Sequence, residues 1–312
     1  MKQLGLKTRK KWTGQDYALL IMAMMGAVFV AIFAYVPMSG IILAFKDGDR
    51  TFNLLKVMLV GEWTFKNFTE LYSDPIFWET FINTLKVNIL MLIFGFPMPI
   101  VFALLMNEIT SKYFKGTVQT ICNLPHFLSW TVFGGIIISL TASDTGIVNP
   151  ILEAIGLSSK ENPVDLNLSQ YFYVKIIGAS ILKGFGWGSI VYTAAIVGID
   201  PGLYEAATID GAGRWKKATR ITLPLIAPTI TVFLLLRISN LLGNSFEQFY
   251  VFESKDDISK SRVLATYVYE LSFTRGKWST ATVLSLSEGV VSIVLLLGSN
   301  WLSKKLAGRG IF

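Results

Sequence analysis

The sequence predicts an all-α integral membrane protein with about six transmembrane helices. Of its 312 residues, 52% are hydrophobic and only 16% are charged, a composition too apolar for an ordinary soluble domain. The apolar residues are also gathered into six separate stretches, each close to the roughly 20 residues that a helix needs to cross the core of a bilayer. These observations favour a helical bundle embedded in the membrane.

The six apolar stretches define the expected spans in chain order. They lie near residues 17–45, 81–106, 118–140, 173–199, 223–242 and 282–302. The first follows a cationic start, as in a signal peptide, but its apolar run is too long and it lacks a small-x-small cleavage site. We therefore expect it to be retained, with a membrane domain over 17–302 between short tails at 1–16 and 303–312.

The distribution of Lys and Arg between the spans predicts the orientation of the chain. Their density is more than twice as high in segments 1–16, 107–117, 199–221 and 303–312 as in the longer segments 46–79, 141–172 and 243–279. Because cytoplasmic loops carry the excess of positive charge, both termini are expected in the cytoplasm. In one outer segment, residues 146–157 have apolar side chains at helical spacing, which predicts either a short surface helix or a solvated linker.

Several classes of function are excluded by the composition. The single cysteine, Cys122, cannot form an intrachain disulfide. The only histidine, His126, has no second ligand at metal-binding spacing, so we expect a packing role and no metal site. The net charge of +7 follows the topology and forms no single basic face, so nucleic acid is not an expected partner. No GxxxxGK[ST] loop occurs, so the chain is not expected to be an enzyme or to bind a cofactor itself.

The loop between the fourth and fifth spans, 200–224, predicts a short projecting helix. Asp200 can cap a helix that begins with a proline, and Asp210 with Gly211 can end it, because glycine adopts a left-handed conformation at little cost. Four cations then return the chain towards the membrane, and Pro224 falls near the start of the next span. On physical grounds this helix is either a docking element for a partner's groove or a connector that lies on the lipid headgroups.

The same loop resembles a known motif. Its residues Glu205-Ala206-Ala207, Asp210-Gly211-Ala212, Ile221 and Pro224 are similar to the EAA loop of permeases in binding-protein-dependent ABC importers. The resemblance implies a type I importer permease fold in which a cytoplasmic coupling helix is seated on the ATPase subunit. Glu205 would engage the ATPase surface, and Gly211 would permit the turn between two short helices. Ala218 departs from the pattern, because such loops usually carry a large apolar residue there.

Residues 35–46, 83–85 and 146–149 resemble the carbohydrate-uptake branch of that family, which is maltose-permease-like. This branch implies a permease subunit in a bacterial cell membrane that forms part of the path for a carbohydrate, expected to be an oligosaccharide. The implied partners are a second permease in a heterodimeric core, two ATPase subunits that bind ATP and Mg, an external solute-binding protein and membrane lipids. The alternatives are an ABC permease for a non-sugar solute and a secondary transporter.

Polar residues inside the spans mark the expected transport path, because such residues usually face the interior of a bundle. In the fifth span, one stripe is expected from spacings of three and four: Arg237, Asn240, Asn244 and Glu247. In the fourth span, small, polar and aromatic side chains suited to a sugar ring cluster together: Ser180, Lys183, Gly184 and Trp187. The resemblance adds the third span near Trp130 and Phe133. Helix packing is the alternative role for all of these residues.

Charge inside the bundle raises a further question. Lys183 and Arg237 are the two cations deep in the fourth and fifth spans, whereas Glu288 is the only acid deep in any span. An unpaired buried charge is costly, so at least one cation needs another partner. We expect a hydrated path or a carboxylate of the partner permease to meet it, with an acidic group on the cargo as the alternative. Glu288 could also serve a secondary transporter as a proton relay.

Overall fold

The computed structural model describes residues 13–48, 54–159, 163–254 and 256–307, so residues 1–12 and 308–312 of the predicted tails lie outside the described residues. The described part is almost entirely helical and has no strand, only an isolated bridge between Lys46 and Trp63. Five of its helical segments are long and apolar enough to cross a membrane, or up to six if one bent pair counts as a single span. The prediction of an all-helical membrane protein with about six spans is therefore confirmed.

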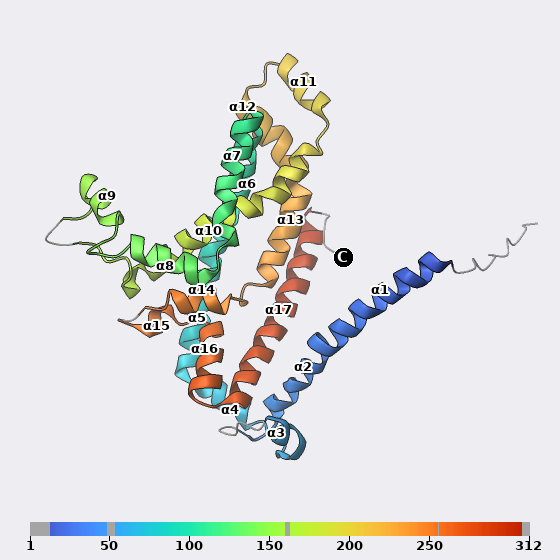
Figure 1. Cartoon of the computed structure of the whole chain (residues 1–312), viewed down its shortest axis with the longest axis vertical. Helices are drawn as coiled ribbons and strands as arrows, with labels where there is room; N and C mark the ends of the chain where they lie inside the picture. Colours follow the sequence, from blue (N-terminus) through green and yellow to red (C-terminus); the bar gives the residue numbers. More distant parts are fainter. Residues whose placement is uncertain (1–12, 49–53, 160–162, 255, 308–312) are drawn as a thin grey trace, which may run out of the picture.

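The long segments are Gly14–Phe45, Pro75–Asn107, Ser169–Val197, Arg214–Ser239 and Trp278–Lys305 (Figure 1). They contain α1 Gly14–Val30, α2 Val36–Met38, α5 Pro75–Leu90, α6 Pro97–Asn107, α10 Phe172–Val197, α12 Arg214–Lys217, α13 Leu223–Ser239 and α17 Trp278–Ala307. The shorter helices are α3 Leu54–Val60, α4 Lys66–Ser73, α7 Lys112–Asn123, α8 Trp130–Leu140, α9 Val148–Ala154, α11 Pro201–Ile209, α14 Phe246–Val251, α15 Ile258–Ser261 and α16 Leu264–Tyr269. The segment 146–157 thus contains a short helix, α9.

Three of the long segments continue through a proline by the same local device. A π-helical turn ends two residues before each of Pro37, Pro97 and Pro224. A proline lacks the N–H of the regular helical ladder, and its ring crowds the carbonyl four residues earlier. In each case that carbonyl lies inside the π turn, where the wider i→i+5 pattern makes room for the ring. The spans therefore stay continuous where the proline alone would kink or break them.

The third span is different, and the expectation of one helix over 118–140 is wrong. A turn of 3-10 helix, Leu124–Phe127, follows α7, and α8 then begins at Trp130 after a bend of 104°. Leu128 and Ser129 between them are extended, and the Ser129 hydroxyl accepts from the N–H of Val132, which makes it the N-cap of α8. Pro125 and this serine are the local residues that favour the end of one helix and the start of another within an apolar stretch.

The bundle packs around three groups of buried side chains. At the end away from α11 they include Leu71, Tyr267 and Leu284, and at the middle Phe172 and Phe249. Nearer α11 the buried side chains include Ile100, Ala103, Tyr192 and Ile226. The helix α10 packs along α6, and α13 packs along α17. These pairings fix α10 and α13, the two helices that carry the fourth- and fifth-span candidates.

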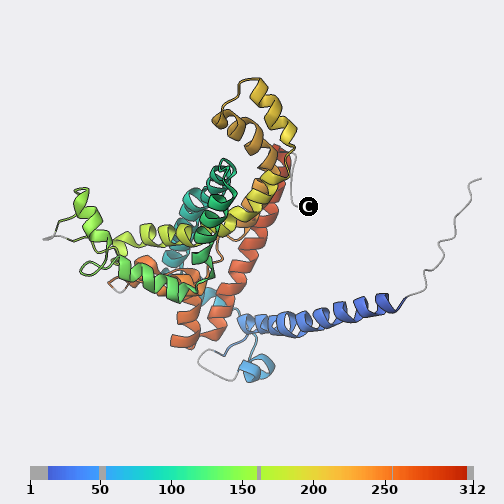
Figure 2. The ribbon, with the colours of Figure 1, turned by 45° about the horizontal axis from the view of Figure 1, so that its top comes forward.

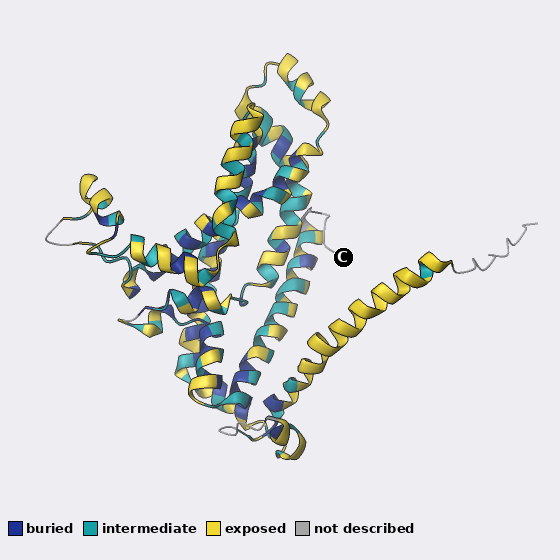
Figure 3. Ribbon diagram, in the orientation of Figure 1, coloured by how far each residue is buried: buried dark blue, intermediate teal, exposed yellow. Residues whose placement is uncertain are grey.

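The helix α1 leaves the rest of the molecule as an arm (Figures 1 and 2). None of its residues is buried within the chain, and nearly all of the arm is exposed in Figure 3. Its apolar side chains, such as Phe29 and Phe33, are therefore available to lipid or to another subunit. The arm contributes nothing to the packing of the candidate sites.

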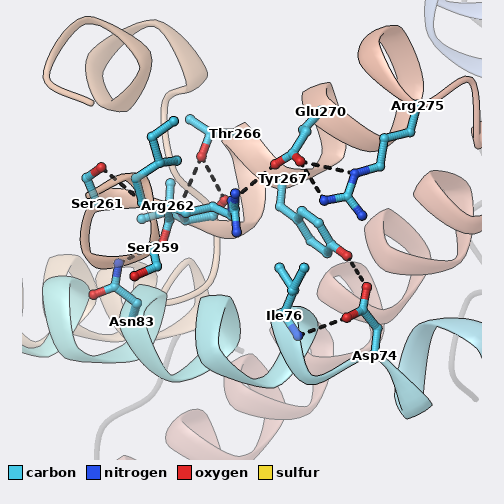
Figure 4. A network of polar contacts seen from close by, with 12 residues as sticks. Asp74, Ile76, Asn83, Ser259, Ser261, Arg262, Thr266, Tyr267, Glu270 and Arg275 are labelled. Atoms are coloured by element: carbon cyan, nitrogen blue, oxygen red, sulfur yellow. Dashed lines mark hydrogen bonds and ion pairs between the residues drawn. The ribbon is translucent and has the colours of Figure 1, made fainter. Parts of the chain in front are cut away.

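A polar network fixes the segment after α15 to the start of α5 (Figure 4). The Tyr267 hydroxyl donates to Asp74 at 2.6 Å, and the Asp74 carboxylate also caps α5 by accepting from the N–H of Ile76. Glu270 pairs with Arg275 at 2.6 Å and with Arg262 at 3.1 Å. These bonds fix one arrangement of the elements at the end of the bundle that lies opposite α11.

Candidate functional site

The helix α11 forms as the local sequence predicts. The Asp200 side chain accepts from the N–H of Gly202 at 2.9 Å and so caps the first turn, and Pro201 occupies the first helical position. At the other end, the N–H groups of Gly211 and Ala212 donate to the carbonyls of Thr208 and Ala207. This pair of bonds is a Schellman motif, which requires a left-handed residue, and Gly211 has φ of +73°.

Side chains tie α11 to the following span. The hydroxyls of Tyr204 and Thr222 are 2.8 Å apart, and the Lys217 ammonium donates to the Thr208 hydroxyl at 2.7 Å. Thr222 is buried whereas Tyr204 is half-buried, so this contact anchors the helix at the membrane end of the loop. The loop is thus a built element held at a defined angle, which projects beyond the bundle in Figures 1 and 2.

The outward face of α11 carries the residues of the coupling motif. Glu205, Ala206 and Asp210 are exposed, and Ala207 is half-buried. Two large apolar residues join them, since Leu203 is 46% and Ile209 is 88% exposed. A small, partly apolar face with two exposed acids is suited to a groove on another protein.

The chain after α11 becomes helical earlier than expected. The next helix begins at Arg214. Pro224 therefore lies inside the continuous segment Arg214–Ser239 and not near its beginning. Ala218, the departure from the coupling-loop pattern, falls in the π turn before Pro224. The π turn is the reason why the helix can begin ten residues before a proline.

Lys183 lies at the break in the third span. Its ammonium donates to the carbonyls of Pro125 and His126, both at 3.0 Å, and to that of Leu128. It also lies over the rings of Trp130 and Phe133, at 5.2 Å and 5.7 Å from their centroids. The side chain is only 7% exposed. The cation predicted for the path is therefore already satisfied by backbone carbonyls and aromatic faces.

The single stripe predicted for the fifth span is wrong. The helix α13 ends at Ser239, not near 242, and Asn240 is its C-cap. Asn244 lies in the following non-helical stretch, and Glu247 belongs to α14. Gly243 with the Asn and Ser that follow it favours a turn, so the spacing of three and four does not continue as one helical face.

The displaced residues of this stripe have separate surroundings. The Glu247 carboxylate accepts from the N–H and the hydroxyl of Thr131, at 3.1 Å and 2.9 Å, and so lies at the start of α8. The side-chain N–H2 of Asn244 is buried and, among the described residues, has no hydrogen-bond partner. Asn240 is exposed. The start of α8, after the break in the third span, thus lies beside α14, which follows the end of the fifth span.

Arg237 lies on the wall of a cavity of about 240 Å³ between the second, fourth and fifth spans. The lining includes Met91, Ser180 and Gly184, and a guanidinium nitrogen of Arg237 lies 3.7 Å from the Met91 sulfur. Among the described residues, no carboxylate lies within ion-pair distance of Arg237. The structure therefore brings Arg237 and Gly184 together, whereas Trp187 lies at the break in the third span.

Two aromatic residues at the third-span break were not predicted as site residues. The His126 ring stacks on Trp187, with centroids 4.6 Å apart and planes at 4°, and Phe127 meets the same indole edge-on at 5.7 Å. Trp187 is 46% and Phe127 is 69% exposed, so the cluster faces outwards. The signal that could have found them is the Leu-Pro-His-Phe run itself, because a proline followed by aromatics inside a span indicates a break with exposed rings.

Comparison with known proteins bears on both regions. Residues 95–309 match the family described as binding-protein-dependent transport system inner membrane component. Protein LplB of Bacillus subtilis (strain 168) is 38% identical over 304 residues, which cover 97% of this chain and 92% of that protein. The polygalacturonan/rhamnogalacturonan transport system permease protein YteP of the same strain is 36% identical over 298 residues, which cover 96% and 91%.

Solved structures agree with the sequence relatives. A chain of a bacterial alginate ABC transporter, in complex with alginate pentasaccharide-bound periplasmic protein, matches with a TM-score of 0.83 at 36% identity. The match covers 95% of this chain and 97% of that chain. The match to the family covers more than half of the chain and includes α11 and the break in the third span. This chain therefore belongs to the family of binding-protein-dependent transport system inner membrane components.

Proposed function

We propose that this chain forms half of the membrane path of an importer for a carbohydrate, delivered by an external binding protein and driven by ATPase subunits that dock on α11. As a family member it is a multi-pass permease subunit. The observation that carries the docking proposal is the geometry of α11, a helix capped at both ends, tied to the fifth span and exposing Glu205 and Ile209. ATP and Mg would be held by the ATPase subunits, and both termini would lie on the same side as α11.

The remaining partners follow from the same proposal. A second permease in a heterodimeric core would complete the path, since the cavity beside Arg237 and the aromatic cluster at Trp187 are both open to the surface of the single chain. Two ATPase copies would serve the two coupling helices of such a pair. Purification of the complex from membranes tests this: the permease pair and the ATPase should be recovered together, and a chain that transports alone would point to a secondary transporter.

The cargo that fits the site best is an acidic oligosaccharide. Arg237 has no carboxylate partner among the described residues, whereas Lys183 is satisfied by carbonyls. A cation inside a membrane protein needs a counter-charge or water, and a uronate carboxylate passing the cavity would supply one. Two of the similar proteins are named for polygalacturonan/rhamnogalacturonan and for alginate, an acidic polysaccharide. A hydrated path or a carboxylate of the second permease is the competing account of Arg237.

Uptake measurements with matched cargo separate these accounts. The complete complex with its binding protein would be reconstituted in vesicles and supplied with uronate oligosaccharides or with their carboxyl-reduced, neutral counterparts. We expect Arg237→Gln to lower uptake of the acidic form selectively. Equal loss of both forms would assign Arg237 to a structural pair, and no loss of either would remove it from the path. Failure of any saccharide to stimulate ATP hydrolysis would favour a non-sugar solute.

A further inference from the structure

The break in the third span is held from both sides by charges that come from other elements. Its first half, α7 with the 3-10 turn after it, ends near the carbonyls of Pro125, His126 and Leu128, and Lys183 of α10 donates to all three. The Pro125 carbonyl also accepts from the N–H of Leu128. Its second half, α8, begins with free N–H groups, and Glu247 of α14 accepts from the N–H of Thr131. The C-terminal end of a helix attracts a cation and the N-terminal end an anion, so each charge has the favourable sign.

The packing brings both charges close enough to act. A Cβ on Gly186 of α10 would lie 2.6 Å from the carbonyl carbon of Cys122, so only glycine lets α10 pass the last turn of α7 at this distance. One turn earlier along α10, Lys183 therefore reaches the carbonyls. On the other side, the absence of a side chain at Gly134 leaves room for Val251 of α14 against α8. Gln248 of α14 also donates to the Ser180 hydroxyl of α10 at 2.5 Å, which joins the two supporting elements.

The arrangement has a direct consequence for the surface at the break. The stacked ring of His126 and the edge-on ring of Phe127 belong to the same turn whose carbonyls bind Lys183. If the turn continued as a regular helix, these rings would leave the face of Trp187. A bend of 104° in an apolar stretch also leaves backbone groups unpaired, which is costly inside a membrane unless other groups satisfy them.

We propose that Lys183 and Glu247 are positioning residues that together hold the third span in its broken form and so keep the aromatic cluster of His126, Phe127 and Trp187 exposed to the transport path. The functional part of this inference rests on the proposed import activity, but the geometric part does not. Glu247 follows the end of the fifth span, so its bonds to Thr131 also tie the third span to the segment after the fifth. A change at either charge should therefore alter the surface at the third-span break.

The chain offers a matched control for removal of Lys183. Lys175 lies two turns earlier on the same helix and is also buried, at 8% exposure against 7%. Its ammonium has a long contact of 3.5 Å with the carbonyl of Asn167 and lies 5.8 Å from the centroid of the Phe252 ring, and neither residue belongs to the break. Lys183→Met and Lys175→Met remove the same charge from the same helix. Lys183→Arg keeps the charge and several donors, and Glu247→Gln keeps an acceptor but loses the charge.

The test uses the whole complex and two measurements. The first is uptake, resolved into KM and maximal rate. The second is the rate at which a water-soluble maleimide labels the Phe127→Cys thiol in a Cys122→Ser background, which needs no cargo. We expect Lys183→Met, which removes three bonds, to lower the maximal uptake rate and to change the labelling rate, each by about tenfold or more, because the loss of even one charge-assisted bond to a buried acceptor shifts an equilibrium by about that factor. Glu247→Gln should act in the same direction, Lys183→Arg should restore most of both signals, and Lys175→Met should change neither.

Each result decides the question. Unchanged labelling and uptake in Lys183→Met would overturn the proposal, as would equal effects of Lys183→Met and Lys175→Met, because any buried lysine of α10 would then serve. If Lys183→Met does not accumulate in the membrane, the labelling rates of Lys183→Arg and Glu247→Gln are compared instead. Altered labelling in Glu247→Gln but not in Lys183→Arg supports the proposal, and unaltered labelling in Glu247→Gln overturns it. If the wild-type complex imports no saccharide, the proposed function fails while the labelling measurement still tests the role of the two charges.

Discussion

Gly211 gives the sharpest test of how α11 works. Its φ of +73° is forced by the Schellman motif, and a Cβ at this position would meet nothing within 4 Å. Gly211→Ala would therefore add only the conformational cost of a left-handed alanine, about 1–2 kcal/mol. Gly211→Asn should cost less, since asparagine visits this region more readily. Gly211→Pro fixes φ near −65° and removes the bond to Thr208, at a cost of about 3 kcal/mol or more.

The assay is recovery of the ATPase with the permease, together with ATP-driven uptake, at equal permease levels in the membrane. Coupling should decrease from Gly211→Asn through Gly211→Ala to Gly211→Pro. Since about 1.4 kcal/mol is a factor of ten in an equilibrium, Gly211→Ala should lower it about tenfold. Gly213→Ala is the matched control, because Gly213 has φ of −70° and its Cβ would also meet nothing. Normal coupling in Gly211→Pro, or equal losses in Gly211→Ala and Gly213→Ala, would refute the reasoning.

Three other predictions concern the body of the molecule. Tyr267→Phe removes a bond to the Asp74 carboxylate and should lower the free energy of unfolding in detergent by roughly 1.5 kcal/mol; no change would show that the network in Figure 4 is not stabilising. Burial raises the pKa of the Glu253 carboxyl above its ordinary 4.5. The free energy of unfolding therefore falls as the pH rises from about 4.5 through the raised pKa, because the buried group must then carry a charge. Glu253→Gln should therefore raise the unfolding temperature more at pH ~8 than at pH ~4, and an equal rise at both would contradict this. Gly186→Ala should lower the amount of folded protein in the membrane, measured by quantitative blotting after detergent extraction, while Gly184→Ala should not, and equal levels would contradict the close approach of α10 to α7.

The features that the sequence could predict are those with local causes. The cap at Asp200 and the end at Gly211 involve bonds between residues at most five positions apart, so the residue types alone are sufficient to place α11. The long apolar runs likewise predict spans, because hydropathy is a property of the run itself. The break in the third span has a local cause too, Pro125 followed by the Ser129 N-cap, but its two residues are outweighed when hydropathy is averaged over a span.

The features that could not be predicted are set by contacts between distant segments. Lys183 looks like an unpaired cation in the sequence because its partners are backbone carbonyls 55 to 58 positions away, and every residue has a carbonyl. The partner of Glu247 is equally hard to predict from the sequence, since its carboxylate accepts from a threonine 116 positions earlier. A count of acidic and basic residues in the spans therefore overstates the charge available to a cargo. After Lys183 is satisfied, Arg237 alone remains to be explained.

Gly184 and Gly186 show how far this limit extends. They are two positions apart in α10, and the sequence gives no reason to treat them differently. In the structure, a Cβ on Gly184 would meet nothing within 4 Å and would project beside the cavity that Arg237 lines, whereas a Cβ on Gly186 would collide with the backbone of Cys122. Backbone cannot move aside as a flexible side chain can, so the added methyl at 186 must displace α7 from α10. The first glycine therefore lines the cavity beside Arg237 and the second belongs to the packing that allows Lys183 to reach the break, and only the position of α7 distinguishes them.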